Sequence, residues 1–440
     1  MIADAPTAVR QRWRTIDTAA GGLALDLGLY SVSALFAAIT ASTSTLLPHR
    51  AWGAVAAAGY LVATLAVVVQ LVVRQRSPRL VGLASRWVVT GFAWVTTALS
   101  PVLWQSVERA NGRTDRAQEE VLVVEQAGIR LLEHGTPYLG RDAIAALPTG
   151  EQLLGYTPYQ PGMAMFGLPR ALVDTWWTDA RVWFAVGTAV ALALAVATLR
   201  AAPATLGGDR RRDAALLRAV QAATVLPICA LTLATGGDDL PVLALCLLAL
   251  ALAAAGRPGR AGLAVGLAGA LKLFAWPIAL VLIVWGLTRR AGIRVAAGAI
   301  GLPVVALVPA LLVDRDALTE NVLRFPLGHG LVSSPAQSPF PGHLIATALP
   351  GGRLIAAALL VAAGAAIAVR LARRPPGTAA TSALICGYGL LAAIALMPST
   401  RFGYLLYPLA LLAWAPALHR PEAAPTSPAS EHLPGRTTSA

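Results

Sequence analysis

The sequence is poor in charge, in cysteine and above all in lysine. Only 13% of its 440 residues are charged, and Lys272 is the one lysine, whereas 34 arginines supply the other basic side chains. Its three cysteines lie inside apolar runs without metal-ligand spacing, which argues against a disulfide scaffold and a zinc site. The Walker, Gly-x-Ser-x-Gly and His-Glu-x-x-His motifs are absent. We therefore expect neither a metal nor a cofactor.

Long apolar runs fill most of the chain, and 56% of its residues are hydrophobic. Soluble proteins bury apolar residues in alternating patterns, so repeated unbroken runs indicate transmembrane helices. The arginines gather in short segments between these runs, as the positive-inside rule requires, so the net charge of +13 does not indicate a nucleic-acid partner. We predict an all-α polytopic membrane protein with about ten spans, near 24–46, 53–73, 86–104, 181–199, 214–235, 240–255, 295–313, 353–372, 379–397 and 402–418.

A further apolar run, 262–288, carries the lone lysine near its centre. An ammonium group at membrane depth is costly and usually marks a functional site. If the run is one crossing, two arginine clusters that follow it lie outside the cell. If it is re-entrant and broken near Trp276-Pro277, cytoplasmic segments hold 22 arginines and outer segments hold 12. We favour the re-entrant topology, with Lys272 near the tip of a broken helix. Two short tilted crossings would leave the arginine clusters on the same side of the membrane.

Charge and apolar pattern together predict the organisation of the chain. Residues 1–22 form a cytoplasmic N-terminus and 23–418 a multispanning membrane domain. Two long loops, 105–179 and 314–352, lie on the extracytoplasmic face, and the first of them has a net charge of −4. The tail at 419–440 is rich in Pro, Ser, Thr and Ala, so we expect it to be disordered and cytoplasmic.

The first outer loop begins with an amphipathic helix in segment 118–138. Its residues project onto a polar arc and an opposite apolar face, and Gly135 and Pro137 end it. The carboxylate of Glu120 falls in the middle of the apolar face. Burial there would raise the pKa of Glu120 unless a cation pairs with it, which suits a general base. The alternative is an acid favoured by the helix dipole, without a chemical role.

An adjacent acidic pair, Asp238 and Asp239, stands at the start of a predicted outer-facing helix in the segment GGDDLP. N-capping is the ordinary explanation for acids at a helix start. As a functional pair they would bind sugar hydroxyls or a metal, but two adjacent acids without further oxygen ligands are a weak metal signal. We keep them as candidate substrate contacts.

Basic side chains also gather on the predicted outer face. Arg324 and His343 lie with His329 and Gln337 in the loop at 321–346, and Arg401 lies in a short outer turn. Histidines beside an arginine suit the recognition of an anion such as phosphate. The alternative is that these side chains are structural or simply solvated.

Several segments resemble one known family. These are EVLVVEQAGIRLLEHGTPYL and YTPYQPGMAMFGLPRAL in the first outer loop, GLAVGLAGALKLFAWPIAL around the lysine, and STRFGYLLYPL near the C-terminus. They are similar to the motifs of glycosyltransferase family 87, whose members are alpha-1,2-mannosyltransferases that use polyprenyl-phosphate mannose and have the GT-C fold. The likeness extends over about 115–415, and we identify the chain as a divergent member.

The resemblance implies an outward-facing active site and inversion at the sugar carbon. The family's catalytic aspartate falls on Glu120, its lysine on Lys272 and a loop histidine on His343. This sequence departs from the family pattern at several points. It has Glu120 in place of the aspartate, Val124 in place of a tyrosine, GGDDL in place of a Gly-Gln-x-Asn stretch, and two additional helices before the first outer loop. The two Thr-Pro-Tyr segments supply Tyr138 and Tyr159 as candidate substrate contacts.

The sequence thus predicts an integral-membrane glycosyltransferase in the cell membrane. It would move a hexose, mannose by resemblance, from a polyprenyl-phosphate donor to an extracytoplasmic glycan or glycolipid, with membrane lipids as its other partners. Glu120 would be the base, and Lys272, Arg324, Arg401 and His343 would meet the donor phosphate. A polytopic transporter or lipid flippase would also use a mid-membrane lysine. A non-catalytic membrane assembly subunit is the third alternative.

Overall fold

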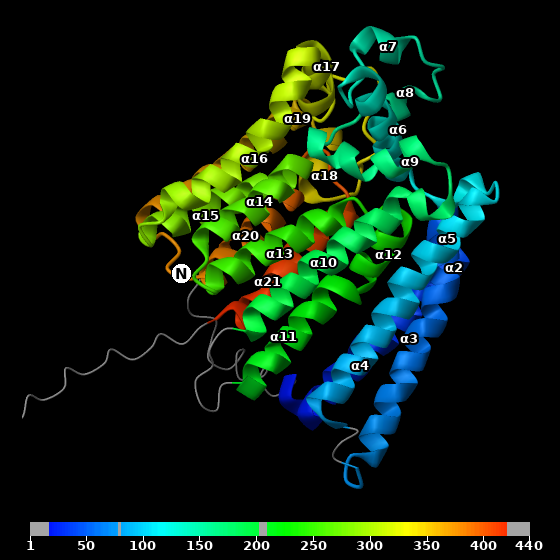
Figure 1. The fold of residues 1–440 in the computed structure, drawn as a ribbon, viewed down its shortest axis with the longest axis vertical. Helices are drawn as coiled ribbons and strands as arrows, with labels where there is room; N and C mark the ends of the chain where they lie inside the picture. The colour runs from blue at the N-terminus through cyan, green and yellow to red at the C-terminus, as the bar shows by residue number, and fades with distance from the viewer. Residues whose placement is uncertain (1–16, 78–80, 202–208, 420–440) are drawn as a thin grey trace, which may run out of the picture.

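The structure is a computed structural model that describes residues 17–77, 81–201 and 209–419. Within these ranges every regular element is a helix, and the one β-bridge pairs Gln337 with Thr400 (Figure 1). The predicted tail and most of the predicted N-terminal segment lie outside the described residues. The predicted all-α polytopic fold is confirmed.

Seven helices of the described residues are long and apolar enough to cross a membrane. They are α2 (Leu23–Thr43) with η1 (Ala19–Gly22), α3 (Leu47–Val73), the continuous α4 (Leu83–Trp94), η3 (Val95–Leu99) and α5 (Ser100–Ala110), α10 (Ala180–Arg200), α16 (Gly292–Val313), α19 (Gly352–Arg373) and α20 (Ala379–Leu396). Helix α5 runs on to Ala110, past residue 105, where the first outer loop is predicted to begin.

The predicted span at 214–235 is not one straight helix. It consists of α11 (Asp209–Thr224) and α12 (Pro227–Thr235), which are bent by 42°. Pro227 supplies no backbone N–H, so the chain ends one helix and starts another there. Counting this pair as a span gives eight. Three shorter apolar helices follow, α13 (Asp239–Ala254), α15 (Trp276–Thr288) and α21 (Leu406–Leu418), and the count of ten stays a prediction.

Helix α13 lies at the centre of the bundle and is buried on nearly every side. Its residues are apolar all round, as a helix without a solvent face requires. It packs against α10, α14 (Pro258–Leu271), α20 and α21, whereas α2 and α3 form a hairpin at one edge (Figure 1). The acids that begin α13 are therefore placed deep in the protein.

The apolar run around the lone lysine forms a helical hairpin. Helix α14 ends at Leu271, Lys272 is extended, and η7 (Leu273–Ala275) leads into α15. Gly262, near the start of α14, and Gly286, near the end of α15, both contact Val295 of α16. The start of α14 and the end of α15 therefore lie at the same end of the bundle. At 14 residues, α14 is about 21 Å long and too short for a 30 Å hydrocarbon layer.

The predicted break is confirmed, but it lies at Lys272 instead of Trp276-Pro277. Pro277 occupies the first turn of α15, where a proline costs no hydrogen bond, so it starts the second helix instead of interrupting the first. The tip of the hairpin is therefore the extended lysine itself. An irregular backbone at this depth has to be enclosed by protein or to line a cavity.

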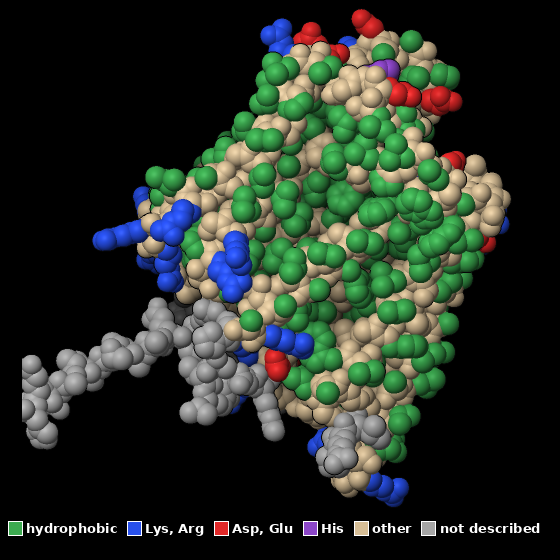
Figure 2. All heavy atoms as spheres, in the orientation of Figure 1, with side chains coloured by type: hydrophobic (Ala, Val, Ile, Leu, Met, Phe, Trp, Pro, Cys, Tyr) green, Lys and Arg blue, Asp and Glu red, His purple; other side chains and the backbone are tan. Residues whose placement is uncertain are grey.

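Short helices cap the end of the bundle to which the hairpin tip points. These are α6 (Glu119–His134), α7 (Arg141–Ala145), α8 (Gln152–Gly155), η5 (Pro161–Phe166), α9 (Leu168–Leu172), α17 (Arg315–Thr319), η8 (Glu320–Arg324) and α18 (Pro341–Ala348). The predicted amphipathic helix is α6, which Gly135 ends with φ of 71°. Figure 2 shows acidic side chains along this end and most arginines toward the opposite one.

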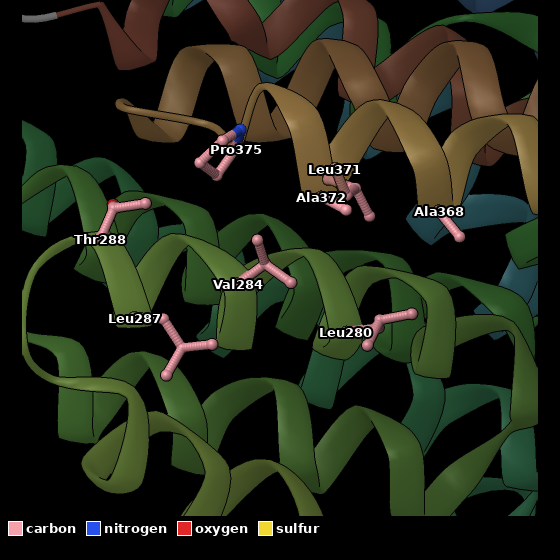
Figure 3. Close-up of a pocket in the computed structure, with 8 residues that line it drawn as sticks. All are labelled: Leu280, Val284, Leu287, Thr288, Ala368, Leu371, Ala372 and Pro375. Atoms are coloured by element: carbon pink, nitrogen blue, oxygen red, sulfur yellow. The ribbon is translucent and has the colours of Figure 1, made fainter.

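A groove of about 540 Å³ separates the distal halves of α15 and α19. Its lining residues are Leu280, Val284, Leu287, Thr288, Ala368, Leu371, Ala372 and Pro375 (Figure 3). Since α15 starts beside Lys272 and the groove follows its second half, the groove lies at the end away from the lysine. It is an apolar surface between helices and not part of the site described next.

Candidate active site

Lys272 contacts both acids that begin α13. Its Nζ lies 2.7 Å from Asp238 Oδ2 and 2.6 Å from Asp239 Oδ1, and all three residues are buried. The side chain of Asp238 makes no capping hydrogen bond to α13, so the ordinary capping explanation does not account for it. The lone lysine is thus enclosed by two acidic side chains.

Aromatic side chains surround this buried ion group. The rings of Tyr159 and Tyr404 lie 5.2 and 5.6 Å from Lys272 Nζ, distances at which a ring face attracts a cation. The hydroxyl of Tyr407 donates to Asp239 Oδ1 at 2.7 Å. Phe274 stacks against Tyr407 with 5.1 Å between ring centroids. The tyrosines come from the outer loop and from the last helical segment, so the hairpin tip joins three parts of the chain.

Glu120 forms an ion pair with Arg401. Glu120 lies in the first turn of α6, and Arg401 is the N-cap of η9 (Phe402–Leu405), 281 residues further on. The side chains of Glu120 and Arg401 are 15% and 33% exposed, so this pair is more accessible than the lysine group. The prediction that Glu120 is partly buried holds, and its cationic partner is another predicted site residue.

The two ion groups are neighbours. A Cβ placed on Gly236 would lie 3.8 Å from Glu120 Oε2, and Gly236 precedes Asp238 by two residues. On the other side, Arg401 precedes Tyr404 by three residues, and Tyr404 contacts Lys272. Glu120 and Lys272 therefore lie at the same end of the bundle, and their roles in one site stay a prediction.

The comparisons with known proteins give one positive result. The model of glycosyltransferase family 87 matches residues 156–400, which is more than half of the chain. The chain belongs to glycosyltransferase family 87. No curated protein and no solved structure matches it. The family match, together with the spanning helices, makes the chain a membrane glycosyltransferase.

The matched region of this family 87 protein includes only part of the candidate site. It contains Tyr159, the two aspartates and Lys272, whereas Glu120 lies before it and Arg401 directly after it. The ion pair thus joins two segments that flank the match. Geometry, and not the match, connects these residues to the rest of the site.

A histidine of the N-terminal hairpin supports the start of α6, and sequence reasoning missed it. Gln118 is the N-cap residue of α6, and its amide Nε2 lies 3.0 Å from His49 Nε2. Thr235 Oγ1 donates to Gln118 Oε1 at 3.0 Å, and the backbone of Gln118 donates to Thr235 O. Gln118 is therefore fixed from two sides, two residues before Glu120. No local pattern around His49 indicates this contact.

A buried ion network lies behind the same loop. Arg109 pairs with Glu125 and Asp179, and Arg181 pairs with Asp179 at 2.8 Å. Arg181 also donates to Ala234 O at 3.1 Å, next to Thr235. Burial opposes the charged form of Asp179, but the two arginines outweigh it and hold the pKa of Asp179 well below its ordinary value. The network joins α5, α6, the start of α10 and the end of α12.

The other predicted aromatic residues lie beside the lysine group. Tyr138 donates its hydroxyl to Tyr159 O at 2.8 Å, so Tyr138 positions Tyr159 and is itself buried. The next residue, Gln160, donates its backbone N–H to Leu271 O, directly before Lys272. Its side-chain Oε1 is buried and has no hydrogen-bond partner within the described ranges. A buried amide oxygen without a partner is costly, so it is a candidate contact for a substrate hydroxyl.

The predicted anion-binding residues of the second outer loop are separated. His343 Nδ1 donates to Pro398 O at 3.0 Å, three residues before Arg401, which places it near the ion pair. Arg324 instead lies 3.4 Å from Glu320, which also accepts from Tyr156 and Arg141. Burial disfavours the charged form of Glu320, but these donors outweigh it and lower the pKa of Glu320. Arg324 therefore belongs to a second ion cluster.

Two tyrosines of the site were missed although the sequence contains a signal for them. Arg401, Tyr404 and Tyr407 are spaced by three residues in the segment STRFGYLLYPL. This spacing puts them on one side of the helical turn that runs from η9 into α21. Reading that stripe together with the arginine would have connected the C-terminal motif to the lysine.

Proposed function

We propose that the protein transfers a hexose, mannose, from a polyprenyl-phosphate donor to a hydroxyl of a glycan or glycolipid on the extracytoplasmic face of the cell membrane. The observation that carries the proposal is the half-open Glu120–Arg401 ion pair directly beside the buried Lys272 group. This pair supports the proposal because a carboxylate and a guanidinium, the groups needed for a base and a phosphate contact, lie together at the end of the bundle that Figure 2 shows with acidic side chains.

Glu120 is the proposed general base. The acceptor oxygen forms a bond to C1 of the sugar while the bond between C1 and the phosphate oxygen breaks. The electron pair of that bond leaves with the polyprenyl phosphate, and the acceptor proton passes to the Glu120 carboxylate. Glu120 is the candidate because its carboxylate belongs to the partly exposed ion pair, where an acceptor hydroxyl can approach it.

Arg401 is the proposed contact of the departing phosphate. Its side chain is the more exposed member of the ion pair, and a planar guanidinium can bind a carboxylate and a phosphate with different N–H groups. A cation positioned where negative charge develops lowers the barrier. His343, whose ring is anchored beside the same turn, is a second proposed contact, and Arg324 would meet a more distant part of the substrate.

Lys272 has a changed role in this proposal. Two of its three N–H groups already face carboxylates, so it is not a free cation waiting for phosphate. We propose that it holds Asp238 and Asp239 in place as acceptors for sugar hydroxyls. Tyr159, positioned by Tyr138, would then form a wall of the sugar site.

The proposal is tested with purified protein and radiolabelled polyprenyl-phosphate mannose, offered with membrane glycolipids as acceptors. We expect label to move to the acceptor with inversion at the sugar carbon. Other polyprenyl-phosphate hexoses identify the sugar if mannose is not accepted. Absence of transfer from every lipid-linked sugar would refute the proposal and favour a transporter or a non-catalytic subunit.

A further inference from the structure

A hollow of about 480 Å³ at the base of the α14–α15 hairpin is lined by Arg257, Pro258, Gly259, Arg260 and Arg294. It lies at the end of the hairpin away from Lys272, because α14 begins there and Gly262 of α14 contacts the first turn of α16. Three of its five lining residues are arginines, and none is acidic. The sugar-transfer site described above does not involve this hollow.

The three arginines are not neutralised by the protein. All three are exposed, and in the part of the chain that the structure describes none of them forms an ion pair. By contrast, Arg86 and Arg181, which are buried, each contact a carboxylate. A charge of +3 concentrated in one hollow without counter-charge is complementary to a polyanionic or phosphate group.

Glycines fix the geometry of this hollow. Gly262 and Gly266 of α14 lie directly against the backbone of α16 at Val295 and Gly298, leaving no room for a side chain. Close helix crossings of this kind need small residues at the contact. Arg294 directly precedes Val295, and Arg260 precedes Gly262 by two residues. The contact between Gly262 and Val295 therefore brings the arginines of α14 and α16 side by side.

Backbone groups add to the positive potential. Pro258 occupies the first turn of α14, and the first intrahelical hydrogen bond that follows is from Ala261 N to Arg257 O. The N–H groups of Gly259 and Arg260 therefore lack intrahelical acceptors, and a helix N-terminus favours an anion. A Cβ on Gly259 would meet no atom within 4 Å, so the approach to these N–H groups is open.

We propose that this hollow binds the phosphate of an anionic phospholipid from the adjacent leaflet. Exposed apolar side chains flank it: Ile293, beside Arg294, is 86% exposed, and Leu263 of α14 is 49% exposed. Exposed apolar side chains next to exposed arginines suit the interface between lipid and water, so the arginines stand at the level of lipid headgroups. Arginine forks bind phosphate with two parallel N–H bonds, which anchors the base of the hairpin whose tip carries Lys272.

The test uses the full-length protein in detergent and native mass spectrometry. Phosphatidylglycerol and phosphatidylcholine with the same acyl chains are titrated against three proteins. These are the wild type, the variant Arg257→Gln/Arg260→Gln/Arg294→Gln, and the control Arg370→Gln/Arg373→Gln/Arg374→Gln, which removes the same charge near the end of α19. An additional titration with phosphatidylglycerol contains excess inorganic phosphate. Melting temperatures show whether each variant is folded.

We expect the wild type and the control to bind one phosphatidylglycerol at least about tenfold more tightly than phosphatidylcholine. The hollow variant should lose this preference, and Arg294→Gln alone should weaken it several-fold if the triple variant does not fold. Equal binding of both lipids by the wild type, or an equal loss in the control, would overturn the proposal. Full displacement of the lipid by inorganic phosphate would assign the hollow to a free anion instead.

Discussion

At the scale of single residues, the account depends on how buried charges are compensated. Lys272, Asp238 and Asp239 satisfy one another inside the bundle, and two tyrosine rings lie against the ammonium group of Lys272. Removing one member of such a group is costly because it leaves the others uncompensated. The half-open pair of Glu120 and Arg401 is different, since solvent reaches it and a substrate can replace one of its contacts.

Replacing the lysine should therefore destabilise the fold as well as affect activity. Lys272→Met leaves two buried carboxylates facing each other, and we expect the free energy of unfolding to fall by about 3–5 kcal/mol. The triple variant Lys272→Met/Asp238→Asn/Asp239→Asn should recover most of this loss. Thermal unfolding in detergent measures both effects. A Lys272→Met protein that melts like the wild type would show that the three charges are not coupled.

Glu320 makes the outer cluster sensitive to acid. Because its folded pKa is lowered below the ordinary value of 4.5, its contribution to stability is present above pH 4.5 and is lost as the pH falls through the folded pKa. Hydrogen exchange of η8 should thus be slow at pH 7 and faster at a pH below the folded pKa of Glu320, after correction for the intrinsic rate. In Glu320→Gln the difference between the two pH values should disappear. If the variant keeps the wild-type pH dependence, another group is responsible.

At the scale of helices, much of the architecture could be predicted from apolar periodicity. The α6 helix, its apolar face and its end at Gly135 follow from residue spacing and turn chemistry, and the broken helix follows from a lysine inside an apolar run. What could not be predicted depends on packing between distant segments. His49 reaches Gln118 only because the N-terminal hairpin lies against the loop that contains α6, and Glu320 meets Tyr156 and Arg141 from a segment about 160 to 180 residues earlier.

The crossing of α14 and α16 should depend on its glycines. Gly266→Ala places a Cβ on the backbone of Gly298, so we expect destabilisation by about 1–3 kcal/mol despite the higher helix propensity of alanine. Gly364→Ala in α19 is the matched control, since its Cβ meets nothing and the substitution should be neutral or stabilising. Melting temperatures compare the two. Equal effects at both positions would contradict the close crossing.

At the scale of the whole molecule, the distribution of charge defines two ends. The acid-rich caps and the ion pair lie at one end, and the arginine-rich ends of α14, α15 and α16 lie at the other (Figure 2). The sequence predicted this polarity because arginines lie between apolar runs. It could not distinguish a hairpin from a crossing, since both have the same composition, and only the contacts of Val295 with both helices separate them.

Cysteine labelling tests this orientation. Ile293 is 86% exposed at the arginine-rich end, and Glu151 is exposed in the opposite cap. Ile293→Cys should react with an impermeant maleimide only after the membrane is opened, whereas Glu151→Cys should react on intact cells. The three native cysteines are buried and form a low background. Labelling of Ile293→Cys on intact cells would reverse the proposed topology.

The central claim is that Glu120 accepts the proton of the acceptor hydroxyl, and one comparison tests it most directly. The rate of sugar transfer is measured for Glu120→Gln and for Glu119→Gln, which removes the same charge from the exposed neighbour in the first turn of α6. The account predicts a loss of about 10²–10⁴-fold for Glu120→Gln and little change for Glu119→Gln. Equal rates in the two variants would contradict it.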